Sequence, residues 1–357
     1  MARRSHPAWK KKHATTKKKP TPFSAAEIPG AIAASMPHEL APQLATLADT
    51  VPSHGEWVYE IKLDGYRLLA RFHAGKVSLI TRRGNDWSAK MPHLIRELEK
   101  MGVQHAWLDG EIVVQKADGT PDFGALQNSL DRNSSGNIVY FLFDVPFFEG
   151  YDLRKVELRD RRALVQAILA ERATEHVRFS DAFDGDPVSI LSSACKMGLE
   201  GIIAKRANAP YASRRTDTWL KLKCKRRQEF VICGYVNRTG ASGQVGSLIL
   251  GVYQNGELVP VGSVGTGWDA KEATSLKTKL TKLEKDTPPF AGGPKKPGRW
   301  SKRVPGGERW VEPSLVAEVE FSEWTSDGSI RHPSYVSLRS DKLPTTIVRE
   351  TVKRIAD

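Results

Sequence analysis

The sequence is poor in cysteine and has no long apolar run. Its 357 residues include three cysteines, Cys195, Cys224 and Cys233, and no CxxC pair. Three cysteines cannot all pair with each other, so we expect no cysteine-built zinc site and predict a reducing, cytoplasmic compartment. No run approaches the ~20 apolar residues of a membrane span. The basic N-terminus is not followed by the apolar segment of a signal peptide, so we expect no membrane partner.

Acidic residues are absent from the N-terminus. Residues 1–20 carry eight Lys or Arg, and the first acid is Glu27, in a chain of net charge +13. A block of like charge predicts a disordered tail that attracts a polyanion such as nucleic acid. The alternative is a solubilising leader. Elsewhere, 40% hydrophobic and 27% charged residues exclude a disordered or collagen-like chain, and the length predicts two domains.

Periodicity predicts strands and helices up to about residue 227. Residues 21–55 are expected to be an extended lead-in. Strand-like segments separated by the turns Asp64-Gly65 and Ala74-Gly75 predict strands over 57–63, 66–73 and 76–81, and apolar runs predict strands over 107–115 and 138–145. Helical spacing predicts helices over 87–101, 158–171 and 187–197, the last capped by Asp186.

Beyond residue 227 strands dominate. They are expected over 229–236, 247–253, 257–264 and 315–324, with one helix after the third strand that begins at an Asp269/Glu272 capping box. Residues 286–313 are expected to be a surface loop. This order favours a small OB-type barrel. We therefore predict a tail and lead-in over 1–36 and domains over 37–227 and 228–357, the second being the barrel.

One segment has the residue types of a catalytic centre. In Glu60-Ile-Lys-Leu-Asp-Gly-Tyr-Arg67, the polar residues Glu60, Lys62 and Asp64 alternate with apolar ones, so Lys62 lies between two carboxylates on one strand face. Such a short pattern alone is weak evidence, because exposed lysines on strands are common. Likewise, Lys221 and Lys223 alternate with leucines, which by itself fits an edge strand protected by lysines.

Further segments strengthen the signal together. They are Thr81-Arg-Arg-Gly84, Leu108-Asp-Gly-Glu111, Tyr140-Phe-Leu-Phe143, Glu200-Gly-Ile-Ile-Ala-Lys205 and Trp219-Leu-Lys-Leu-Lys223. In this order they resemble the motifs of the covalent nucleotidyltransferases, which are ATP-dependent DNA ligases, RNA ligases and mRNA capping enzymes. Residues 42–47, 149–154, 323–333 and 338–342 resemble more closely the ligase domains of bacterial LigD-type end-joining enzymes. The implied fold is α+β, an adenylation domain with antiparallel sheets and helices followed by an OB-fold β-barrel.

The resemblance implies a three-step reaction through a lysyl-AMP. Lys62 would attack the α-phosphorus of ATP, AMP would pass to a 5′-phosphate, and a 3′-hydroxyl would then displace it. Lysine is largely protonated at neutral pH, and flanking carboxylates raise its pKa further. We expect the bound metal ion, Mg²⁺ or Mn²⁺, and Lys221 or Lys223 to lower the pKa of Lys62. The resemblance thus favours a functional rather than an edge-strand role for these lysines.

Nucleotide-binding roles follow from the same resemblance. Glu60 would accept a hydrogen bond from the adenine amino group, and Phe143 would stack on adenine, although it could also be a core residue. Glu111 would contact the ribose or a metal ion, and Glu200 would be a metal ligand. The remaining implied contacts, to ribose, phosphates or nick ends, involve Arg67, Arg82, Arg215, Lys221 and Lys223.

Five other residues complete the predicted site. Asp64 would help to hold the 3′-hydroxyl and metal or only shape the turn. Lys205 would reach a phosphate or form a structural ion pair. Arg339, Asp341 and Lys342 resemble the last motif, which closes over the nucleotide during the first step.

The resulting prediction is an ATP-dependent DNA ligase that repairs DNA by non-homologous end joining. We expect nicked or broken duplex DNA as substrate, bacterial Ku as a partner, and a monomeric protein. The alternatives are an RNA ligase, a GTP-dependent capping-type enzyme, and a silent DNA-end-binding module. Only some 40 residues precede the motifs, too few for a polymerase or phosphoesterase domain, so those activities would come from other chains.

Overall fold

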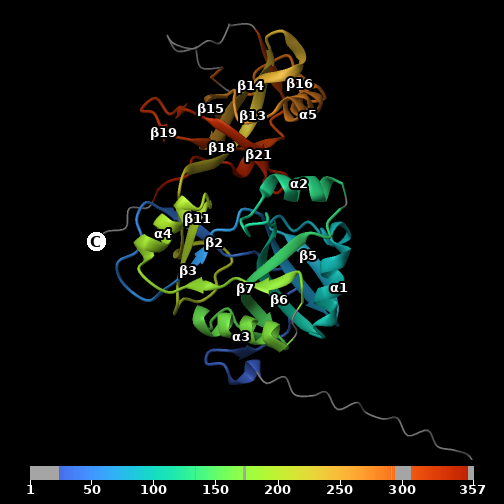
Figure 1. Cartoon of the computed structure of the whole chain (residues 1–357), viewed down its shortest axis with the longest axis vertical. Coiled ribbons are helices and arrows are strands. Elements are labelled where there is room, and N and C mark those ends of the chain that lie inside the picture. Colours follow the sequence, from blue (N-terminus) through green and yellow to red (C-terminus); the bar gives the residue numbers. More distant parts are fainter. Residues whose placement is uncertain (1–23, 133, 172–173, 291, 294–306, 353–357) are drawn as a thin grey trace, which may run out of the picture.

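The computed structural model describes residues 24–132, 134–171, 174–290, 292–293 and 307–352. The predicted basic tail over 1–20 lies outside these residues. Two sheets form the N-terminal part, residues 24–223, and a third forms the C-terminal part, residues 226–352, which lies above the first two in Figure 1. The predicted domain boundary at residue 227 remains a prediction.

The first sheet has seven strands in the order β1-β8-β7-β6-β4-β5, with β9 pairing parallel to β7. Helices α1, α2 and α3 pack on β5, β6 and β7 and enclose the largest apolar core. The strands are β1 (Ile32–Ala33), β4 (Tyr66–His73), β5 (Lys76–Thr81), β6 (His105–Val114), β7 (Ile138–Phe148), β8 (Tyr151–Asp152) and β9 (Val177–Phe179). The helices are α1 (Pro92–Lys100), α2 (Phe123–Asp131) and α3 (Leu158–Glu171), with short 3-10 turns η1 (Ala25–Glu27) and η2 (Ser88–Lys90).

The second sheet has five strands in the order β10-β3-β11-β12-β2. Helix α4 packs on β11, and Asp186 caps it by accepting a hydrogen bond from the Ser189 N–H, as predicted. The elements are β2 (Leu44–Ala48), β3 (Trp57–Ile61), β10 (Ala182–Phe183), β11 (Gly201–Arg206), β12 (Arg215–Lys223) and α4 (Pro187–Lys196).

The C-terminal sheet has seven strands. β15, β14, β13, β17 and β16 follow one another, and β13 also pairs with β18, which pairs with β21. Among the described residues this path does not close into a ring. Helix α5 follows the third strand, as predicted. The elements are β13 (Arg226–Arg238), β14 (Ala241–Gln254), β15 (Glu257–Val264), α5 (Ala270–Thr281), β16 (Glu284–Lys285), β17 (Glu308–Val311), β18 (Val316–Phe321) and β21 (Ser334–Leu338), with a separate hairpin of β19 (Glu323–Trp324) and β20 (Ile330–Arg331) and a turn η3 (Pro344–Thr346).

Several local predictions need correction. The expected lead-in contains β2, and the expected loop over 286–313 contains β17, although 294–306 lie outside the described residues. The helix expected over 87–101 begins only at Pro92, because proline fits the first helical position and lacks the N–H needed further in. The capping box is half formed: Asp269 accepts from the Glu272 N–H, but the Glu272 carboxylate accepts from Tyr335 Oη.

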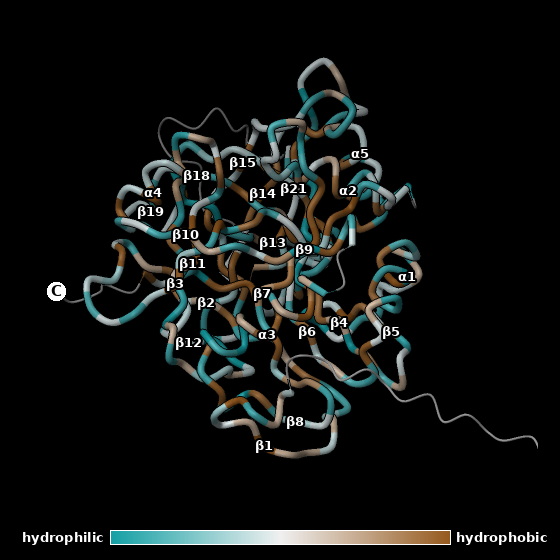
Figure 2. Tube along the Cα trace, turned by 60° about the horizontal axis from the view of Figure 1, so that its bottom comes forward, coloured by the Kyte–Doolittle hydropathy of each residue, from teal (hydrophilic) through white to brown (hydrophobic). Residues whose placement is uncertain are grey.

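Apolar segments gather along the sheets in the interior, and most of the hydrophilic segments lie toward the outside (Figure 2). Cys195 and Cys224 form a disulfide between α4 and the residue after β12, which the sequence did not predict, while Cys233 is free and buried. Among the described helices, none has the length and apolar character needed to cross a membrane.

Candidate active site

A cavity at the junction of the three sheets brings all the predicted site residues together. Its wall includes nine Lys or Arg and seven Asp or Glu, so it suits a multiply charged anion accompanied by cations. The predicted residues in this wall are Glu60, Lys62, Asp64, Arg67, Arg82, Glu111, Phe143, Glu200, Lys205, Arg215, Lys221, Lys223, Arg339, Asp341 and Lys342.

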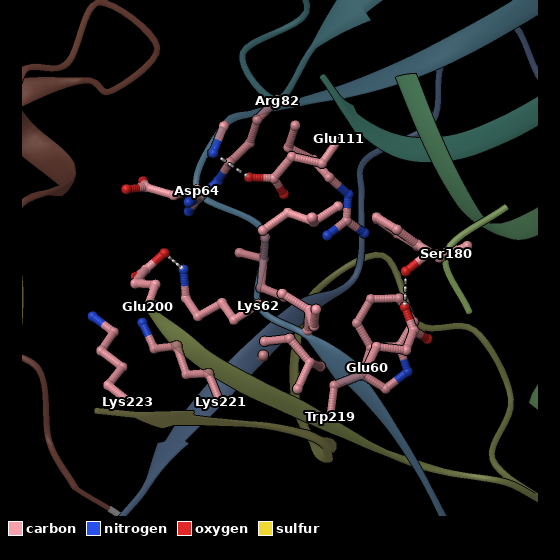
Figure 3. A pocket seen from close by; sticks show the side chains of 18 of the residues that line it. Glu60, Lys62, Asp64, Arg82, Glu111, Ser180, Glu200, Trp219, Lys221 and Lys223 are labelled. Carbon is pink, nitrogen blue, oxygen red and sulfur yellow. Dashed lines mark hydrogen bonds and ion pairs between the residues drawn. The ribbon is translucent and has the colours of Figure 1, made fainter. Parts of the chain in front are cut away.

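Lys62 projects into the cavity just beyond the end of β3 (Figure 3). Its backbone N–H donates to the Gly201 carbonyl at 3.0 Å, and its Nζ donates to Glu200 Oε2. Burial lowers the pKa of Lys62, but Glu200, Glu111 and Asp64 outweigh burial and raise the pKa above its ordinary value. The flanking carboxylates thus raise this pKa, as predicted, and the lowering expected from the bound metal ion and Lys221 or Lys223 remains a prediction.

The turn after Lys62 requires a glycine. A Cβ at Gly65 would lie 2.1 Å from the Ile112 carbonyl oxygen, so β6 could not approach the turn. This close approach lets the Gly65 N–H donate to Glu111 Oε1 at 3.1 Å. Thus the Asp64-Gly65 turn holds Glu111 on the same side of the cavity as Lys62.

Two half-buried carboxylates, Glu111 and Glu200, have the chemistry of metal ligands. Burial, opposed by Lys62 and Arg67, raises the pKa of Glu111 to about 7, and the charge of Glu200 adds to the rise. No group of three His, Cys, Asp or Glu among the described residues is arranged to hold a metal ion. Mg²⁺ typically uses one or two carboxylates and completes its shell with water and substrate phosphates, so this pair fits such an ion.

Lys221 and Lys223 point into the cavity from β12, while Leu220 and Leu222 are buried on the other face, as the alternation predicted (Figure 3). β12 lies between β11 and β2, so the edge-strand alternative is wrong. Both amines contact Glu350: Lys221 Nζ donates to Oε1, and Lys223 Nζ lies 3.3 Å from Oε2.

Glu60 is buried at another wall of the cavity. Its Oε1 accepts from Arg162 Nη1 and lies 2.6 Å from Lys205 Nζ, and its Oε2 accepts from Ser180 Oγ at 2.9 Å. Lys205 is therefore ion-paired, as the structural alternative held. Burial lowers its pKa to about 8 although Glu60 acts in the opposite direction.

Phe143 and Trp219 form an aromatic wall. Arg67 Cζ lies 4.4 Å from the Phe143 ring centroid, and Lys205 Nζ lies 4.1 Å from it. Arg67 is also held by Asp109 through hydrogen bonds of 2.5 and 2.6 Å. The Trp219 indole N–H is buried without a hydrogen-bond partner among the described residues. Stacking of adenine on Phe143 and a phosphate or ribose role for Arg67 remain predictions.

Arg82 and Arg215 lie together in the wall near these groups. Burial, with the charges of Arg215 and Arg67, lowers the pKa of Arg82, although Glu229 opposes this. Arg215 Nη1 donates to the Ala45 carbonyl in β2. With Arg67 and Arg339, the cavity wall holds four guanidinium groups, which is typical of an anion site.

The C-terminal part completes the cavity. Arg339 donates to Asp341 at 2.9 Å and to Glu318 at 3.0 Å, and its Nη2 lies 3.5 Å from the Gly65 carbonyl oxygen. Lys342 Nζ lies 2.8 Å from Glu229. The last predicted motif thus lies directly beside the turn that follows Lys62.

Sequence reasoning missed several residues. Arg162 could have been found, because Arg161 and Arg162 interrupt the apolar stripe of α3 and charged residues rarely lie on such a face unless paired. No comparable pattern pointed to the others, which are Ser180, Arg227, Glu229, Glu318 and Glu350.

Comparisons with known proteins agree with this geometry. Residues 39–223 match the family described as ATP dependent DNA ligase domain, and residues 241–342 match ATP dependent DNA ligase C terminal region. The multifunctional non-homologous end joining protein LigD of Pseudomonas aeruginosa is 44% identical over 310 residues, 86% of this chain and 36% of that protein. LigD of Mycobacterium tuberculosis (strain H37Rv), described as a multifunctional non-homologous end joining DNA repair protein, is 37% identical over 314 residues, 87% of this chain and 40% of that protein.

A solved structure, described as mycobacterial DNA ligase D complexed with ATP and MES, is 37% identical with a TM-score of 0.64 and covers 87% of this chain and 98% of that one. This match confirms the predicted fold class. The chain spans only 36% to 40% of the length of the two curated relatives. With both family descriptions matched in order and the motif residues gathered in one cavity, the chain belongs to the ATP-dependent DNA ligase family.

Proposed function

We propose that this chain seals breaks between a 5′-phosphate and a 3′-hydroxyl in duplex DNA, with ATP as the cosubstrate and Lys62 as the nucleophile. The observation that carries the proposal is the single cavity that joins Lys62, the carboxylates Glu111 and Glu200, and the cationic strand of Lys221 and Lys223. An amine nucleophile needs cations around the phosphate it attacks and carboxylates for a divalent ion, and this wall holds both.

The proposed reaction has three steps. The Lys62 amine forms a bond to the α-phosphorus of ATP, pyrophosphate leaves, and the lysine proton is released. A 5′-phosphate oxygen of DNA then attacks the same phosphorus, and the Lys62 amine leaves. Finally the 3′-hydroxyl attacks the 5′-phosphate, AMP leaves, and the strand is joined.

The chain's own residues would prepare the first step. Lys221 and Lys223 would bind the α-phosphate, and Arg339 and Lys342 would meet the outgoing pyrophosphate. Glu111 and Glu200 would hold Mg²⁺ or Mn²⁺, which would offset the negative charge that keeps the Lys62 amine protonated. Glu60 would accept from the adenine amino group, and Phe143 would stack on the base.

The biological setting is part of the proposal. The two curated relatives are named for non-homologous end joining, which supports a role in that repair process, in the cytoplasm and with bacterial Ku as a partner.

The proposal is tested with α-labelled ATP and divalent metal. Wild-type chain should retain label after denaturation and should seal a nicked duplex. Lys62→Ala should lose both activities, whereas the exposed control Lys76→Ala should keep them. A wild-type chain that takes label only from GTP, or seals only RNA, would replace the DNA-ligase proposal. A chain that takes no label, even after treatment with pyrophosphate to remove bound AMP, would overturn it.

A further inference from the structure

Glu60 lies at the centre of a buried charge cluster at one wall of the cavity. The residue is 2% exposed and lies in β3, between β10 and β11 of the second sheet, where it pairs with Ile203 of β11. Both Glu60 and Ser180 line the cavity, and their hydrogen bond is drawn in Figure 3. The charged member of this cluster that the predicted motifs do not include is Arg162.

Arg162 reaches Glu60 from helix α3 and does not itself line the cavity. Its Nη1 donates to Glu60 Oε1, and its Nη2 donates to the Ser180 carbonyl oxygen at 2.8 Å. Its Cζ lies 4.6 Å from the centroid of the Phe179 ring. Contacts with Glu60, the Ser180 carbonyl and the Phe179 ring therefore hold the guanidinium in place. It can act on a ligand in the cavity only through Glu60 and Ser180.

These contacts leave Glu60 with little spare hydrogen-bonding capacity. A carboxylate offers about four acceptor sites on its two oxygens. Arg162 donates to Oε1, the Lys205 ammonium lies 2.6 Å from the same oxygen as an ion pair and covers it, and the Ser180 hydroxyl donates to one site of Oε2. One site on Oε2 remains, and an ionised carboxylate at that site can only accept.

A single acceptor at this wall distinguishes the two common purines. Adenine carries an amino group at the six-position of the ring, whereas guanine carries a carbonyl oxygen there. The amino group can donate to the free site of Glu60, but the carbonyl oxygen would be repelled by it. A polar site of this kind rejects a mismatched ligand strongly, because its own buried group is then left unpaired.

We propose that Arg162 is a positioning residue for nucleotide selection: it fixes the Glu60 carboxylate so that its one free acceptor faces the purine and favours ATP over GTP. The inference rests on the proposed function, since it takes Glu60 as the group that meets the base. It adds a residue on α3, outside the predicted motifs, to the selection of the nucleotide.

The neighbouring Arg161 provides the contrast. It is also buried, and it donates to Asp144 at 2.7 and 3.0 Å and to the Ala209 carbonyl oxygen. Neither Arg161 nor Asp144 is among the residues that line the cavity. Arg161 therefore serves as a matched control for the loss of a buried arginine in the same helix.

The test measures labelling of the full chain with α-labelled ATP and GTP in wild type, Arg162→Met, Arg162→Lys and Arg161→Lys. For Arg162→Met we expect the KM for ATP to rise about tenfold, kcat at saturating ATP to stay within about threefold, and the ATP-to-GTP ratio of kcat/KM to fall about tenfold. Arg162→Lys, which keeps the charge but loses the second donor, should show smaller changes in the same direction. Arg161→Lys should lower the melting temperature and leave the ratio unchanged.

The outcomes separate the inference from the proposed function. A wild-type chain that labels with ATP, together with Arg162 variants of unchanged KM and unchanged ratio, would overturn the inference alone. If Arg162→Met does not fold, Arg162→Lys decides by the same two readouts. If Arg161→Lys changes the ratio as much as Arg162→Lys does, the effect is general destabilisation and the inference fails. A wild-type chain that never labels would remove the proposed function and the inference together.

Discussion

The Glu350 carboxylate accepts a hydrogen bond from Lys221 Nζ through Oε1, and its Oε2 lies 3.3 Å from Lys223 Nζ. The glutamate is held from the C-terminal part, because its backbone N–H donates to Gln228 Oε1 at 3.0 Å. Burial raises the pKa of the Glu350 carboxyl, but the charges of Lys221 and Lys223 outweigh burial and lower the pKa below its ordinary value. A carboxylate thus occupies the two amines that we assign to the α-phosphate.

Glu350→Gln should therefore improve ATP binding. The substitution keeps the size of the side chain and removes the charge that competes with phosphate. We expect the KM for ATP in the labelling reaction to fall about fivefold, which corresponds to roughly 1 kcal/mol. The matched control is Glu320→Gln, which removes a carboxylate paired with exposed Lys225. A higher KM in Glu350→Gln would show that the glutamate assists the nucleotide instead.

Arg339→Ala should separate the first step from the last. Arg339 joins Glu318 and Asp341 and approaches the carbonyl oxygen of Gly65 beside Lys62. Loss of this link should reduce labelling by ATP at least tenfold while sealing of a pre-adenylated nick stays within about threefold. Arg331→Ala, which removes an exposed arginine paired with Glu323, is the control. Equal losses in both assays would contradict this assignment.

Lys205 should make stability depend on pH in the alkaline range. Burial lowers its folded-state pKa to about 8 from an ordinary 10.5. Between these values the unfolded chain binds more protons, so deprotonation favours the folded state as the pH rises. We expect the unfolding free energy of wild type minus that of Lys205→Met to increase by roughly 2 kcal/mol from pH 7.5 to 9.5 in urea titrations. For the exposed control Lys225→Met, the same difference should not change with pH. If the difference for Lys205→Met is also independent of pH, the prediction is wrong.

The Cys195–Cys224 disulfide should stabilise the second sheet. Its sequence separation is 29 residues, and a cross-link of this span contributes roughly 3 kcal/mol through the unfolded chain. Reduction should lower the unfolding free energy of wild type and of Cys233→Ala, but not of the Cys195→Ser/Cys224→Ser double variant. Reaction of three thiols rather than one in the denatured, unreduced protein would contradict the bond.

The residues of the candidate site were predictable because they lie in short motifs. Lys221 and Lys223 alternate with the buried Leu220 and Leu222 in β12, so local periodicity placed them on their correct face, and Glu60 and Lys62 reach the same cavity from the end of β3. The family resemblance supplied their order. It could not supply Glu350, which has no periodic neighbours and reaches the lysines only through long-range packing.

Other errors came from tertiary context. β2 looks like a loop because only a few apolar residues stand between prolines, yet it is ordered by pairing in parallel with β12. Helix α2 was not predicted, because it is only nine residues long. Its signals were nevertheless present, since Asp122 caps it and its apolar residues have helical spacing.

The pairing of β2 with β12 limits how far the chain can be shortened for laboratory use. Leu44 pairs with Arg215 and Leu47 with Lys221, and the Gln43 amide donates to Thr216 and Thr218. An expression fragment that started after Ala48 would expose the backbone edge of β12, and such edges recruit strands from neighbouring molecules. A fragment intended for crystallisation or labelling therefore needs to begin before Gln43, well upstream of Lys62.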